Sequence, residues 1–194
     1  MERERQIWKY IVILLMALGI VITGGGYLGK ILERSDPEYY TRHFQMGGYY
    51  LKEEVFDLAA RELEKAVEAR ADSVDARYFL GITYQRMGKW EQALEEYRRL
   101  AEEGSDSYEV FNYMGIVYGK LGNRQEALQA FNHAVRLNPA YYPAYFNRAN
   151  LYEAEGNIDL AAKEYQFIKE NAAGKPETEE FARRAAGRLE TLRK

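Results

Sequence analysis

The sequence predicts an all-α protein in which pairs of helices stack into a solenoid, and three periodic features of the chain carry this prediction. Tyrosine recurs every 34 residues, at Tyr50, Tyr84, Tyr118 and Tyr152. Alanine recurs with the same period, at Ala59, Ala93, Ala127 and Ala161. Glycine recurs between these two positions, at Gly88, Gly122 and Gly156. A fixed period of this length is the signature of a repeat architecture.

Each 34-residue unit is predicted to contain two helices joined by a turn near its fifteenth residue, where the recurring glycine ends the first helix. Small residues occupy position 8 of the units, at Gly47, Gly81, Gly115 and Ala149. Together with the alanine at position 20, they allow the two helices of a unit to approach closely, while the tyrosines at position 11 fill the space between units. One unit cannot cover its own apolar face, so the units must stack.

This pattern resembles the tetratricopeptide repeat, and the resemblance covers residues 40–175. It implies a right-handed solenoid of four repeats, at residues 40–73, 74–107, 108–141 and 142–175. The position at which the family usually carries tryptophan is filled instead by His43, Arg77, Phe111 and Tyr145. Residues 176–194 contain Phe181, Ala185, Leu189 and Leu192 at helical spacing, and we expect them to form a helix that caps the last repeat.

The amino-terminal segment predicts a membrane anchor. No charged residue lies between Tyr10 and Leu28, and this apolar stretch is long enough to cross a bilayer as a helix. We therefore predict a short tail at 1–6, a transmembrane helix at 7–32 in contact with the lipid bilayer, and a linker at 33–39. A cleaved signal peptide and a buried core helix are the alternatives, but no small-residue cleavage site follows the apolar run.

The charges that flank this segment predict its orientation. Arg3, Arg5 and Lys9 precede it, whereas Lys30 and Arg34 follow it. The positive-inside rule then predicts a single-pass membrane protein with its amino terminus in the cytoplasm and its repeats in the periplasm or an equivalent exterior space. The spacing of Gly25 and Gly29 would also permit contact with another membrane helix.

The composition argues against most chemical functions. The chain has no cysteine and two histidines, His43 and His133, which fall in different repeats. Its formal net charge of −3 disfavours nucleic-acid binding. Gly24 to Gly29 match the letters of a dinucleotide-binding loop, but no second strand is expected after them. We predict no catalytic residue, no metal and no cofactor; an enzyme that binds a nucleotide at these glycines is the least favoured hypothesis.

The resemblance implies a concave groove, lined by the first helix of each repeat, that binds a peptide segment or a helix of another protein. The residues that we assign to this groove are Tyr78, Gln85, Arg86, Asn112, Tyr113, Lys120, Phe146, Asn147 and Asn150. The carboxylate clamp that some members of the family use for acidic carboxy termini is absent, because only Asn147 matches it.

The sequence therefore predicts a membrane-anchored scaffold for protein–protein interaction. We expect it to act as an adaptor or assembly factor for a membrane complex or an exported client. The alternative is a permanent accessory subunit of a large membrane protein complex.

Overall fold

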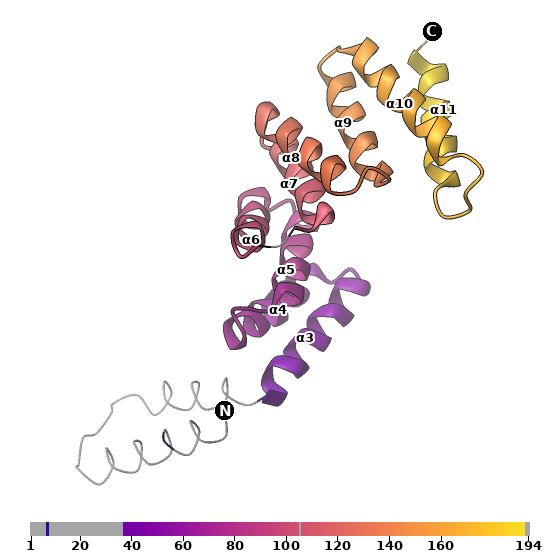
Figure 1. Cartoon of the computed structure of the whole chain (residues 1–194). Coiled ribbons are helices and arrows are strands. Elements are labelled where there is room, and N and C mark those ends of the chain that lie inside the picture. Colours follow the sequence, from indigo (N-terminus) through magenta and orange to yellow (C-terminus); the bar gives the residue numbers. More distant parts are fainter. Residues whose placement is uncertain (1–6, 8–36, 105, 193–194) are drawn as a thin grey trace.

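A computed structural model of the chain describes residue 7, residues 37–104 and residues 106–192, and in these parts it contains helices and no strand (Figure 1). The helices are α3 (Pro37–Lys52), α4 (Phe56–Ala69), α5 (Val74–Arg86), α6 (Trp90–Glu102), α7 (Tyr108–Lys120), α8 (Arg124–Leu137), α9 (Tyr142–Ala154), α10 (Ile158–Ala172) and α11 (Glu179–Leu192). The predicted all-α solenoid of helix pairs is confirmed.

The helices form a curved, elongated stack, with α3 at one end and α11 at the other (Figure 1). Each first helix packs against its second helix, as α3 does against α4 and α7 against α8. Direct contacts along the stack also join first helices, since α3 contacts α5 and α7 contacts α9, and the helix α11 contacts α9 at the end of the stack. We call α3, α5, α7 and α9 the first-helix layer; α4, α6, α8 and α10 form the second layer.

The close approach within each repeat depends on the small residues predicted from the period. A Cβ atom added to Gly81 would lie 2.6 Å from Cε1 of Tyr97, and one added to Gly115 would lie 2.6 Å from Cδ1 of Phe131. The facing rings are almost fully buried. The recurring alanines Ala59, Ala93, Ala127 and Ala161 are all 0% exposed. The small residues at positions 8 and 20 therefore allow the two helices of a repeat to pack closely against each other.

The turns between paired helices use a left-handed residue at the same place in every repeat. Gly88, Gly122 and Gly156 have φ values of 72°, 77° and 74°. In the first repeat the equivalent residue is Glu54, with φ 59°. A glycine adopts this conformation without steric penalty, whereas a glutamate is strained there.

The recurring tyrosines at position 11 join one repeat to the previous one. The Tyr84 hydroxyl donates to Glu64 Oε1 at 2.7 Å, and Arg98 Nη2 donates to the Tyr118 hydroxyl at 3.2 Å. Both tyrosines are buried, whereas Tyr50 and Tyr152 are half-buried. The phenol ring thus fills the gap between repeats while its hydroxyl reaches a polar partner.

The buried core divides into two parts between the third and fourth repeats. One cluster extends from Ala60 in α4 to Phe131 in α8. The other extends from Tyr142 in α9 to Leu189 in α11. The helix α11 covers the last repeat with Ala182, Ala185 and Leu189, which are buried. We call the boundary between the two clusters the junction.

The predicted localisation as a single-pass membrane protein has to be corrected. Among residues 7, 37–104 and 106–192, no helix combines the length and the apolar character that a bilayer crossing requires. The proposed span at 7–32, its lipid contact and the pair Gly25 and Gly29 lie, apart from Ile7, outside the described residues. The orientation with repeats on the exterior side is therefore withdrawn.

Candidate protein-interaction surface

The first-helix layer carries all nine residues that the resemblance assigned to a groove, but they differ in how far solvent reaches them. Arg86, Lys120 and Asn150 are exposed. Tyr78, Gln85, Tyr113 and Asn147 are half-buried. Asn112 and Phe146 are buried, at 3% and 7% exposure.

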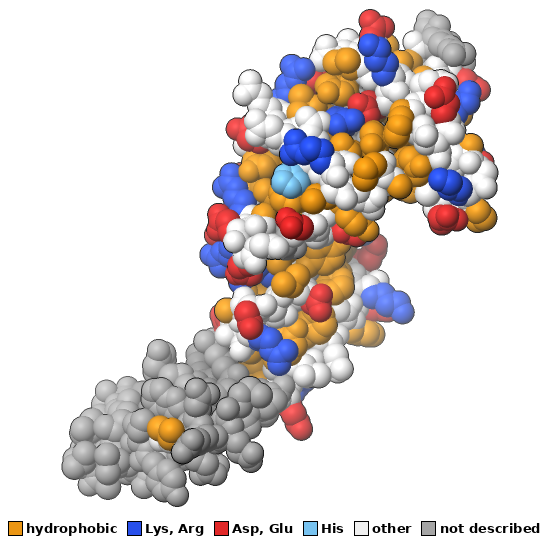
Figure 2. Space-filling model, viewed as in Figure 1, with side chains coloured by type: hydrophobic (Ala, Val, Ile, Leu, Met, Phe, Trp, Pro, Cys, Tyr) orange, Lys and Arg blue, Asp and Glu red, His pale blue; other side chains and the backbone are white. Residues whose placement is uncertain are grey.

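An unbroken series of aromatic rings crosses the first-helix layer. The Tyr40 ring stacks on Phe44 with centroids 5.6 Å apart, and Phe44 contacts Phe79 at 5.8 Å. Phe79 contacts Tyr78 at 5.7 Å, and Tyr78 contacts Tyr113 at 5.9 Å. We call these five residues, which are all half-buried, the aromatic stripe. It runs over α3, α5 and α7, and Figure 2 shows hydrophobic side chains gathered in patches along the stack among charged ones.

The stripe is anchored to the core at Tyr113. This ring stacks on Tyr97, with centroids 5.7 Å apart and an interplanar angle of 14°. The Tyr97 hydroxyl donates to Gln85 Oε1 at 3.1 Å, and burial raises the pKa of Tyr97 well above its ordinary value. Gln85 thus contacts a core tyrosine on which the Tyr113 ring of the stripe stacks.

Two of the residues that were predicted to line the groove are hydrogen-bonded to each other. Asn147 Nδ2 donates to Asn112 Oδ1 at 2.9 Å, which links α9 to α7 across the junction. The pair therefore joins the two halves of the stack.

The fourth repeat offers less open surface because α11 covers it. The Arg184 guanidinium lies 4.4 Å from the centroid of the Phe146 ring. The Tyr165 hydroxyl donates to Asn150 Oδ1 at 2.6 Å, and burial is the main cause that raises the pKa of Tyr165 to about 12.

Residues missed at the sequence level extend the surface at both ends. Tyr40 and Phe44 belong to the first repeat, for which no groove residue was assigned, although Phe44 occupies the same repeat position as Tyr78 and Phe146. Tyr141 lies in the connection between α8 and α9, outside the positions that the family uses for its groove. The aromatic residues at position 5 of the second and fourth repeats were the sequence pattern that could have identified Phe44.

In the first two repeats, polar contacts between the two helices occupy the place of the family's usual tryptophan. Arg77 Nη1 donates to Glu96 Oε2 at 3.0 Å, and His43 contacts Glu62 in the same way in the first repeat. In the third repeat, the His133 ring stacks on Phe111 with centroids 3.9 Å apart. Both histidines thus have structural partners. Within the described residues, no three carboxylate or histidine side chains gather as a metal site would require.

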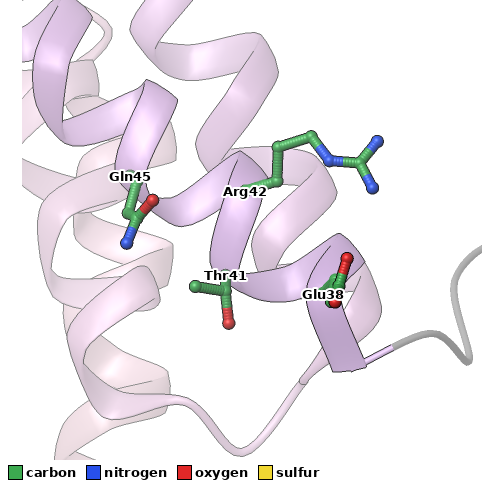
Figure 3. A pocket seen from close by; sticks show the side chains of 4 residues that line it. All are labelled: Glu38, Thr41, Arg42 and Gln45. Carbon is green, nitrogen blue, oxygen red and sulfur yellow. The ribbon is translucent and has the colours of Figure 1, made fainter.

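A hollow lies at the start of α3. It is lined by Glu38, Thr41, Arg42 and Gln45, whose spacing places them on one face of the helix. Figure 3 shows all four side chains projecting from α3, and all four are exposed.

Comparison with known families agrees with this geometry. Two sequence profiles of the tetratricopeptide repeat match the chain, one over residues 50–111 and the other over residues 114–176. Together they span well over half of its 194 residues. The chain belongs to the tetratricopeptide repeat family. No curated protein matches this tetratricopeptide repeat protein.

Solved structures share the fold of this tetratricopeptide repeat protein at low sequence identity. MamA is 23% identical, with a TM-score of 0.63 over 81% of this chain and 87% of MamA. YrrB, described as a TPR protein with an unusual peptide-binding site, is 21% identical with a TM-score of 0.58, over 76% of each chain. PcrH, solved with the chaperone binding region of PopD, is 24% identical with a TM-score of 0.59, over 63% of this chain and 92% of PcrH.

Proposed function

We propose that this protein is an interaction scaffold that holds a segment of another protein against its first-helix layer and performs no chemical step itself. The observation that carries the proposal is the aromatic stripe, a connected row of half-buried rings on one layer of the solenoid. Half-buried tyrosine and phenylalanine rings offer large, rigid contact area and lose little conformational entropy when a partner binds.

The polar residues beside the stripe suit the backbone and the side chains of a bound segment. Arg86 and Lys120 are exposed in the last turns of α5 and α7. Arg86 already contacts Glu54 at 2.8 Å, in an exposed ion pair that a partner can exchange at little cost. The first-helix layer therefore combines aromatic rings with exposed charges, as protein interfaces do.

Two of the structural relatives support this class of partner. A peptide-binding site is attributed to YrrB, and PcrH is in complex with a region of PopD. At these identities the likeness establishes the fold, and the transfer of a segment-binding role to this chain is part of the proposal.

We favour the role of an adaptor or assembly factor that binds its partner reversibly. A permanent accessory subunit would need a larger and more apolar docking surface than this stripe of five half-buried rings. Purification of the chain with its partner distinguishes the two roles: sub-stoichiometric, salt-sensitive recovery fits an adaptor, and a stoichiometric, salt-resistant complex fits a subunit.

The absence of cysteine from the sequence allows a direct test of the binding surface. Segments are selected from a random displayed library on the full chain, and each selected segment is synthesised. A bulky maleimide is then attached at Lys120→Cys in the first-helix layer or, as the matched control, at Arg136→Cys on α8. Both positions are exposed, and both lie on helices.

The proposal predicts that the label at position 120 abolishes binding of the selected segments, whereas the same label at position 136 leaves their affinity unchanged. Loss of binding from the label on α8 alone would contradict the proposal, as would a failure to select any segment.

A further inference from the structure

In the second and third repeats, one side of the first helix is buried against the repeat before it. In α5, Phe79 contacts Phe44 of the preceding repeat at 5.8 Å, and the Tyr84 hydroxyl donates to Glu64 Oε1 at 2.7 Å. Positions 3, 7 and 10 of the repeat lie between these two contacts around the helix. These positions are buried in both repeats, where they carry Ala76, Leu80, Thr83, Val110, Met114 and Val117. This side of a first helix is therefore the surface by which consecutive repeats join.

The same side of α3 is open to solvent in the first repeat, which has no described repeat before it. Positions 3, 7, 10 and 14 carry Arg42, Met46, Tyr49 and Glu53, and all four residues are exposed. Tyr49 is 57% exposed, although Thr83 and Val117 at the equivalent positions are fully buried. We call Arg42, Met46, Tyr49 and Glu53 the end face.

The end face forms a single row along α3. Its residues follow one another at spacings of four, three and four, which place them on one side of a helix. The Glu53 backbone N–H donates to the Tyr49 carbonyl oxygen at 3.0 Å, so the helical geometry extends to the last residue of the row. Figure 3 shows the Arg42 side chain projecting from the helix near the other end. The row therefore has an apolar centre, a cation at one end and an anion at the other.

Such a row is complementary to a second copy of itself that runs in the opposite direction. Arg42 precedes Met46 by four residues, and Glu53 follows Tyr49 by four. When two α3 helices pack antiparallel about a two-fold axis, Met46 of each copy lies opposite Tyr49 of the other, and Arg42 lies opposite Glu53. A parallel pair would place like charges opposite each other, which is unfavourable.

The charges also distinguish a second copy from the apolar segment of the same chain. The residues between Tyr10 and Leu28 carry no charge, so this stretch offers no counter-charge to Arg42 or Glu53. A second copy offers both counter-charges together with the apolar contact.

We propose that the end face is a self-association site, at which two copies of the chain pair through antiparallel α3 helices. Each copy covers on the other the surface that a preceding repeat covers on α5 and α7. One face of one helix is small beside the surface that permanent dimers bury, so the pairing is reversible. The aromatic stripe uses Tyr40 and Phe44 of α3, which are not part of the end face, so this site is separate from the proposed binding surface.

Energy transfer between labelled copies measures the pairing. Because the chain has no cysteine, Gln92→Cys, at an exposed position on α6, attaches one dye to each full chain. Chains labelled with donor are mixed with chains labelled with acceptor, and transfer is followed as their total concentration rises. We expect a saturable rise in transfer. Absence of transfer at every concentration would overturn the inference, and it is the result expected if another segment of the same chain covers the end face.

Exchange of the two charges locates the contact. Arg42→Glu places a carboxylate opposite Glu53 of the second copy, and Glu53→Arg places a guanidinium group opposite Arg42. We expect each variant alone to self-associate about tenfold more weakly than the unchanged chain, or weaker still. An equimolar mixture of the two variants should associate at least as tightly as the unchanged chain, because every opposed pair again has opposite signs.

Two further comparisons separate this contact from other causes. Tyr49→Ser removes the apolar centre at an exposed position, so self-association should weaken while the circular dichroism spectrum stays unchanged. The matched controls are Arg183→Glu and Glu190→Arg, both exposed on α11 at the other end of the stack, and they should leave the transfer unchanged.

Unchanged self-association of Arg42→Glu and Glu53→Arg would overturn the inference. A mixture of these two variants that associates no better than either variant alone would also overturn it. Neither result bears on the proposed function, which is tested separately by the label at position 120.

Discussion

The side chain of Asn147 donates to the side chain of Asn112 across the junction at 2.9 Å, where the two clusters of the core meet. Asn112 is 3% exposed, whereas Asn147 is half-buried. A polar bond therefore joins the two clusters, in addition to Leu151 of α9, which packs against the first cluster. This buried hydrogen bond contributes to the stability of the fold mainly because the loss of either side chain would leave the other without a hydrogen-bond partner.

We expect Asn112→Ala and Asn147→Ala each to lower the free energy of unfolding by about 1–2 kcal/mol. The double variant should lose about 1 kcal/mol less than the sum of the two single losses, because the second change removes a partner that is already unpaired. Urea denaturation of the four proteins, followed by circular dichroism, measures the coupling. Strict additivity would show that the bond contributes nothing to the junction.

A methyl group added at Gly81 should destabilise the second repeat. The added Cβ would lie 2.6 Å from the ring of Tyr97, which is fully buried. We expect Gly81→Ala to lower the free energy of unfolding by about 1–2 kcal/mol, as overpacking does. The matched control is Gly48→Ala in α3, where an added Cβ meets nothing within 4 Å. That control should stabilise the chain by about 0.5–1 kcal/mol through helix propensity, so thermal melting of the two variants should move in opposite directions.

Replacement of Glu54 by glycine should stabilise the first repeat. Glu54 has φ 59°, at the position where the other repeats carry glycine. Relief of this conformation should raise the free energy of unfolding by about 1 kcal/mol. The exposed ion pair with Arg86 is lost in the same change, but such pairs contribute little. The variant Arg86→Gln keeps Glu54 but removes the ion pair, together with the contact of the Arg86 guanidinium with the Phe56 ring, and serves as the comparison in denaturant titrations. A lower midpoint for Glu54→Gly than for Arg86→Gln would refute the strain argument.

The stability of the first helix pair should depend on pH in the acid range. Burial alone would raise the pKa of Glu62, but hydrogen bonds from Lys65 and His43 outweigh it and hold this pKa below its ordinary value of 4.5. A carboxyl group whose pKa is lower in the folded state stabilises the fold above its unfolded pKa and loses that contribution as the pH falls. We therefore expect the free energy of unfolding to fall below pH 4.5, and Glu62→Gln to flatten this part of the profile. An unchanged acid limb in the variant would contradict the assignment.

The repeat architecture could be predicted from the sequence because its physical cause is local and recurs. Position 8 must be small wherever a ring such as Tyr97 or Phe131 lies opposite, and the alanine at position 20 is buried in every repeat. A requirement that recurs with a fixed period leaves a visible pattern in a single chain.

The surface could be predicted only in part, because the family's groove positions do not reveal what each side chain contacts. Asn112 and Asn147 occupy groove positions but bond to each other, and α11 places Arg184 over Phe146. These contacts join residues from different helices, so the repeat period does not encode them. Tyr141 was not predicted as a surface residue because it departs from the repeat pattern. The same position carries serine in the two preceding repeats.

The membrane localisation was inferred from hydropathy between residues 7 and 32, and the described helices do not supply a span. An apolar run in the sequence does not by itself distinguish a segment that contacts lipid from one that packs against protein.

The claim that a partner segment lies along the first-helix layer is tested most directly by paramagnetic broadening. A nitroxide spin label is attached at Lys120→Cys on α7 or at Arg136→Cys on α8, and the amide signals of an isotope-labelled selected segment are recorded at saturation. Our account predicts strong broadening of the segment's signals from the label at position 120 and weak broadening from the label at position 136. Strong broadening from position 136, with none from position 120, would place the segment on the second layer and contradict the account.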